Sequence, residues 1–203
     1  MMISIIFFSL WINIVTSSHF NGGTITWTPV YPNSNSSSIL ITVTQSYSWI
    51  SPNENCTTNI PRSFTGGNTN LICIANCTTQ GGYATQLISI KTDCVSYSQS
   101  LGIVFSERSV NITLNVSTYF WIAYRGFAWR TLENALISTN PPWSIASLID
   151  LRRRPDGLIN TPPISQVASP QYVLVNTTTA INLLVSDVNT GDDLRCRWPL
   201  SSK

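Results

Sequence analysis

The chain is short of charge, of lysine and of histidine. Charged residues make up 10% of its 203 residues, whereas an average soluble domain has about 25%. The net charge of +2 gives no electrostatic basis for binding nucleic acid. A single histidine, His19, and few carboxylates supply few groups for acid–base or metal catalysis. We therefore expect a protein that is not an enzyme.

Uncharged hydroxyl and amide side chains supply the polarity instead. The sequence holds 27 Ser, 23 Thr and 18 Asn. Hydrophobic residues make up 43% of the chain, which argues against disorder. The length suits one or two domains.

The first 18 residues have the pattern of a secretory signal peptide. An apolar run from Ile3 to Val15 is followed by small residues at positions 16–18. As a helix this run would span roughly 20 Å, too short for the ~30 Å hydrocarbon core of a membrane. Residues 1–18 are therefore predicted to be a signal peptide. Because no later run resembles a membrane span, we expect a secreted or cell-surface protein.

Six Asn-x-Ser/Thr triplets become predicted glycosylation sites in a secreted chain. They begin at Asn35, Asn55, Asn76, Asn111, Asn115 and Asn176.

The five cysteines indicate disulfides rather than a metal site. Cys56, Cys73, Cys77 and Cys94 are clustered, and no second pair or nearby histidine would complete a zinc site. In an oxidising compartment we expect the four to form two disulfides, and three pairings remain open. The remaining cysteine, Cys196, is expected to be unpaired within this chain.

Short alternating apolar segments predict an all-β, sandwich-like fold for residues 19–158. The predicted strands are Thr24–Val30, Ile39–Trp49, Leu87–Lys91, Val110–Val116 and Thr118–Tyr124. In Val110–Val116 the outward positions carry the sequons Asn111 and Asn115, so their glycans would face solvent. Most tryptophans fall in or beside strands, so we expect them in the core, the alternative being a surface that stacks on sugars.

A proline-rich stretch near residues 156–163 marks a boundary, because proline cannot donate to a β-ladder. Strand patterns then continue at Gln171–Val175, Ala180–Val185 and Leu194–Trp198. Residues 159–203 are too few for a sandwich of roughly 100 residues. We interpret them as the start of a second, incomplete β module.

One polar cluster in this second segment offers oxygen ligands. Asp187, Asn189, Asp192 and Asp193 lie within seven residues, a density that could bind Ca²⁺. The alternative is a polar β-turn, since Asp, Asn and Gly favour turns. No other cofactor is expected.

Several motifs resemble those of secreted or cell-surface proteins of invertebrate animals. They are SHFNGG at residues 18–23, LRRRPD at 151–156, NTPP at 160–163, and VSDVNTGDDLRCRW at 185–198. The resemblance implies an extracellular N-terminal β module followed by a cadherin-like or Ig-like module. It implies Ca²⁺ only at Asp187, Asp192 and Asp193. It also places a cysteine where this chain has Thr177, which would leave Cys196 without its partner.

Together these observations predict a non-catalytic module of an extracellular glycoprotein with a structural, adhesive or recognition role. The alternative is a lectin-like module that binds carbohydrate, assisted by Ca²⁺. The expected partners are extracellular proteins or glycans.

Overall fold

The computed structural model describes residues 19–32, 36–50, 56–61, 67–127, 129, 141–166 and 173–197. The predicted signal peptide and the sequons at Asn35 and Asn55 lie outside these residues.

The fold is all-β, as the sequence predicts. Seven strands form the main body: β1 (His19–Pro29), β2 (Ser38–Ile50), β3 (Ile72–Ala75), β4 (Asp93–Ser98), β5 (Ile103–Asn115), β6 (Tyr119–Gly126) and β7 (Trp143–Asp150). Two 3₁₀ turns, η1 (Cys77–Thr79) and η2 (Tyr83–Thr85), lie between β3 and β4. The predicted strand at residues 87–91 is absent, and β3, β4 and β7 were not predicted.

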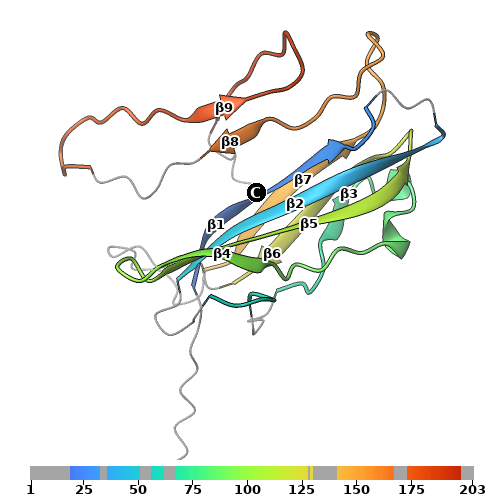
Figure 1. Cartoon of the computed structure of the whole chain (residues 1–203). Helices are drawn as coiled ribbons and strands as arrows, with labels where there is room; N and C mark the ends of the chain where they lie inside the picture. Colours follow the sequence, from blue (N-terminus) through green and yellow to red (C-terminus); the bar gives the residue numbers. More distant parts are fainter. Residues whose placement is uncertain are drawn as a thin grey trace, which may run out of the picture.

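The strands form two antiparallel sheets packed face to face (Figure 1). One sheet has the order β1-β2-β5-β4 and the other has the order β3-β6-β7. With the strands lettered in chain order these are ABED and CFG, the arrangement of a constant-type immunoglobulin domain. Neither β2 nor β6 contains a cysteine, so the disulfide that joins strands B and F in antibody domains has no counterpart here.

The long central strand β2 shows why hydroxyl residues suit this fold. Its 13 residues alternate without exception between buried and partly exposed positions. On the outward side Thr42 Oγ1 donates to Asn111 Oδ1 of β5 at 2.8 Å, and the Thr44 and Ser109 hydroxyls lie 2.9 Å apart. Short hydroxyl side chains thus pair across the strands on the solvent side of the sheet.

Aromatic side chains fill one end of the core. The Phe20 ring stacks on the Trp143 ring with centroids 3.8 Å apart, and it meets Trp49 edge-on at 4.8 Å. Trp27 and Trp49 are buried, whereas Trp129 and Trp143 are partly buried against the core. Trp121 is the exception, because it is 36% exposed on β6. The prediction that tryptophans lie in the core therefore holds for most of those described.

Beyond the sandwich the chain forms only a short hairpin, β8 (Ile164–Gln166) with β9 (Leu184–Ser186). Figure 1 shows this hairpin alongside the sandwich rather than within either sheet. β9 overlaps the predicted strand 180–185. Residues 173–175 and 194–197, which fall in two other predicted strands, are not strands. Large apolar side chains such as Leu174 and Leu184 stay exposed, so the described part of this segment has no core of its own.

Candidate functional site

The four clustered cysteines form two disulfides, as predicted. The pairs are Cys56–Cys94 and Cys73–Cys77, which selects one of the three pairings that the sequence left open. Cys196 is exposed and carries a free thiol. No other cysteine is left to pair with it in this chain.

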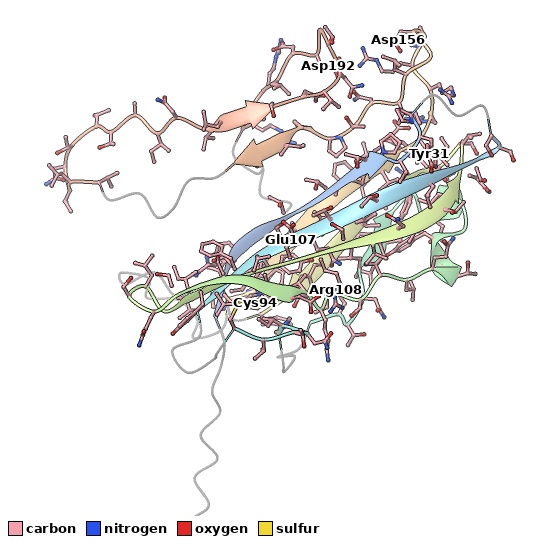
Figure 2. All side chains as sticks on the ribbon, viewed as in Figure 1. Tyr31, Cys94, Glu107, Arg108, Asp156 and Asp192 are labelled. Atoms are coloured by element: carbon pink, nitrogen blue, oxygen red, sulfur yellow. A yellow bond between two sulfur atoms is a disulfide. The ribbon has the colours of Figure 1, made fainter. Side chains whose placement is uncertain are left out.

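An arginine–aspartate pair supports the longer disulfide. Arg108 of β5 contacts both carboxylate oxygens of Asp93, at 3.1 and 2.9 Å, and donates to Asn59 Oδ1 at 2.9 Å. These hydrogen bonds from Arg108 hold the pKa of Asp93 below its usual value. Figure 2 shows Arg108 and Cys94 on the adjacent strands β5 and β4. The cluster fixes the segment that contains Cys56 against this edge of the sheet.

The described sequons all lie at the surface. Asn111 and Asn115 are exposed on the outward side of β5, and Asn76 and Asn176 are exposed in turns. The hydrogen bond from Thr42 uses Asn111 Oδ1 and leaves Nδ2, the atom that N-glycosylation modifies, without a partner among the described residues. These positions suit the predicted glycans.

Asn189 connects the hairpin segment to the end of the sandwich. Its side chain is 8% exposed. Its Oδ1 accepts hydrogen bonds from the backbone N–H and the hydroxyl of Thr161, both at 2.9 Å, and its Nδ2 donates to the carbonyl of Ile159 at 3.0 Å. One buried amide therefore joins the turn after β9 to the proline-rich segment before β8.

An arginine bridges the same two segments from outside. Arg154 Nη1 lies 2.7 Å from Asp192 Oδ1, and its Nε lies 3.4 Å from Asp156 Oδ2. Figure 2 shows Asp156 and Asp192 on neighbouring turns at one end of the molecule. The hydrogen bond to Asp192 raises the pKa of Arg154 above its ordinary value, so the cation is fixed in its charged form.

These contacts involve the residues that the sequence offers as Ca²⁺ ligands. Asp192 and Asp193 bind Arg154 and Arg195, and Asp187 Oδ1 accepts the backbone N–H of Asn189 at 2.8 Å. The oxygens therefore face arginines and backbone donors rather than a common centre. Among the described residues no group of three or more His, Cys, Asp or Glu could hold a metal ion. The turn interpretation accounts for the cluster.

A second candidate feature is a groove of about 570 Å³ on the three-stranded sheet, where β6 ends and β7 begins. Its lining includes Asn68, Arg125, Phe127, Pro142 and Ser144. Phe127 is 42% exposed, and Arg125 and Ser144 are exposed cross-strand partners. The groove thus combines an aromatic ring, a guanidinium and a hydroxyl.

Sequence reasoning missed this groove. The predicted strand ended at Tyr124, one residue before Arg125, and the partner strand β7 was not predicted at all. Extending the period-two alternation to residue 125 would have placed Arg125 on the outward side.

Comparison with protein-family models, curated proteins and solved structures gave no match. Within the ranges that the structure describes, no helix is long and apolar enough to cross a membrane.

Proposed function

We propose that this chain is a non-catalytic recognition or adhesion module of a secreted or cell-surface glycoprotein. The strand order of a constant-type immunoglobulin domain supports this function, because such sandwiches serve as rigid frames whose strand faces and loops bind partners. The two disulfides are compatible with an oxidising, extracellular compartment.

The observation that carries the proposal is the unequal decoration of the two sheets. The outward side of β5 bears two sequons, Asn111 and Asn115, whereas the three-stranded sheet has one, Asn76, directly after β3 and next to Ala75, the cross-strand partner of Trp121. Glycans would therefore cover more of the four-stranded sheet, and they would leave β7 and the end of β6 beyond Trp121 accessible. Trp121 lies exposed on the three-stranded sheet, and exposed aromatic residues are typical of protein-binding surfaces.

A binding experiment with the secreted glycoprotein tests this function. We expect a fluorescent tetramer of the full chain to bind the surface of cells from the source tissue. Trp121→Ala should weaken that binding at least fivefold. The matched control is Phe105→Ala, since Phe105 is similarly exposed, 39% against 36%, but lies on the four-stranded sheet. Absence of binding, or equal losses in both variants, would contradict the proposal.

The second candidate is a lectin-like role, which the groove beside Phe127 and Arg125 favours. It does not need Ca²⁺, because arginines and backbone donors already occupy the acidic turn. A glycan array with and without chelator tests this candidate. Binding that persists in chelator supports it, whereas chelator-sensitive binding would restore the Ca²⁺-assisted alternative.

A further inference from the structure

The backbone that lines the groove, where β6 ends and β7 begins, is held by hydrogen bonds and close packing. Asn68 Oδ1 accepts the Arg125 backbone N–H at 2.8 Å, and the Asn68 backbone N–H donates to the Arg125 carbonyl at 3.2 Å. A Cβ at Gly67 would lie 2.6 Å from that carbonyl oxygen, so only glycine permits this approach. These contacts hold one wall of the groove in place before any ligand arrives, which lowers the ordering cost of binding.

The opposite side is equally constrained. The Trp143 indole packs over Gly126, where an added Cβ would meet Cζ2 at 2.6 Å, and its Nε1 donates to the Phe127 carbonyl at 2.9 Å. The backbone of Phe127 is therefore anchored, while its side chain remains 42% exposed. An anchored, exposed aromatic ring provides an apolar platform at the rim of the groove.

Arg125 differs from most of the arginines that the structure describes. Four of them each bind an aspartate, Arg108, Arg152, Arg154 and Arg195, and Arg153 donates to the Gly157 carbonyl. The Arg125 side chain is exposed and has no acidic or hydrogen-bonding partner among the described residues. A guanidinium in this state is free to bind an anionic ligand, and its planar fork matches a carboxylate.

We propose that the groove binds a sugar that carries a carboxylate, such as a sialic or uronic acid at the end of a glycan. The Arg125 guanidinium receives the carboxylate, the Phe127 ring packs against the C–H face of the sugar, and the Ser144 hydroxyl hydrogen-bonds a ring hydroxyl. A volume of about 570 Å³ lies within the range of small-ligand sites. This inference rests on the proposed recognition function and names its ligand.

The surroundings of β7 favour a sugar over an extended peptide. A peptide that added a strand to this sheet would need the free edge of β7. That edge lies beside β1, and Trp27 Nε1 of β1 donates to the Leu148 carbonyl at 2.7 Å. In the groove the exposed cross-strand partners Arg125 and Ser144 present side chains rather than a free backbone edge.

Paired probes that differ only at the carboxylate test the proposal on the full glycosylated chain. The probes are methyl glucuronide against methyl glucoside, and methyl sialoside against its methyl ester, with binding measured by calorimetry or by NMR shifts. We expect each acid to bind about tenfold more tightly than its neutral counterpart, as charge-assisted hydrogen bonds predict. Binding of one acid alone identifies which sugar class fits.

Matched variants locate the binding. Arg125→Gln should weaken binding of the preferred acid about tenfold or more, whereas Arg195→Gln, at a side chain 84% exposed, should not change it. Phe127→Ala should also weaken binding, and Leu158→Ala, at a residue of equal exposure, should not. Circular dichroism of each variant verifies that it is folded.

Three results would overturn the inference. They are equal affinity for acid and neutral probes, equal affinity in the Arg125 and Arg195 variants, and binding of a carboxylate-terminated peptide with no binding of either sugar acid. If the tetramer still binds cells while the sugar acids neither bind nor compete, the recognition function stands and only this ligand assignment fails.

Discussion

The strongest structural prediction concerns Asn189, which joins the hairpin segment to the sandwich. Asn189→Ala removes three hydrogen bonds and leaves the Thr161 N–H and the Ile159 carbonyl without partners. A net loss of about 1 kcal/mol per bond gives about 3 kcal/mol in total. Since 1.4 kcal/mol corresponds to a factor of ten, this junction should open about a hundredfold more often.

The loss should be local to the junction. The Asn189 side chain binds the Ile159 carbonyl and the N–H and hydroxyl of Thr161; both residues lie outside the two sheets, although the Ile159 side chain packs in the core. Hydrogen exchange followed by mass spectrometry should therefore show faster exchange at Thr161 and in the 184–192 turn. The exchange of β2 and β5 and the unfolding midpoint of the sandwich should stay unchanged.

The matched control is Asn182→Ala, because Asn182 is exposed and its side chain makes no hydrogen bond within the described part of the chain. This variant should exchange like the wild type. The reasoning is refuted if the Thr161 amide exchanges at the same rate in Asn189→Ala and Asn182→Ala. It is also refuted if Asn189→Ala lowers the stability of the whole sandwich, because the amide would then be part of the core rather than of a junction.

Three further predictions follow from the disulfides, the buried tyrosines and the glycans. The Cys56–Cys94 disulfide closes a loop with a sequence separation of 38, and Cys73–Cys77 closes one with a separation of 4. Because a longer loop gains more chain entropy when it is opened, replacing the first pair by serines should lower the unfolding free energy by about 4 kcal/mol, and replacing the second by about 2 kcal/mol. Equal losses in urea titrations would contradict this. Burial raises the pKa of Tyr83 from 10.0 to about 12, which favours the neutral phenol in the folded state. The unfolding free energy should therefore fall as pH rises from about 10 to about 12, less steeply in Tyr83→Phe. Unglycosylated bacterial protein should aggregate more than the secreted form in light scattering, because hydroxyls and glycans replace charge at this surface; a monodisperse unglycosylated form would count against this.

The sequence predicts β2 because the burial of its residues alternates with period two. β2 is recognisable because apolar residues occupy nearly every second position along its 13 residues. β3 has only four residues, and β4 carries an irregularity between Cys94 and Ser96 and has no buried residue. Neither leaves an alternating apolar pattern, so the pattern that identifies β2 cannot identify them.

The candidate sites depend on contacts between residues that are far apart in the sequence, and the alternation of apolar residues gives no information about such contacts. Arg154 and Asp192 are 38 residues apart, and the acidic turn alone gives no sign of the arginine that neutralises it. Ca²⁺ binding at this turn therefore stays a prediction, and the contacts that the turn makes are those of the polar-turn alternative. Three of the resemblance motifs, at 151–156, 160–163 and 185–198, nevertheless contact one another at this junction. Arg154 of the first binds Asp192 of the third, and Thr161 of the second binds Asn189 of the third.

The scarcity of charge makes each charged side chain informative. Five of the six aspartates bind an arginine: Asp93, Asp150, Asp156, Asp192 and Asp193. The sixth, Asp187, accepts a backbone N–H. Among the described residues the aspartates therefore mostly serve as partners of nearby arginines, at strand ends, at the junction and in the exposed turn after β9. Of the two arginines in described strands, Arg108 binds an aspartate and Arg125 does not. In a protein that pairs its aspartates so consistently, an unpaired guanidinium in a groove points to an anion that comes from outside the chain.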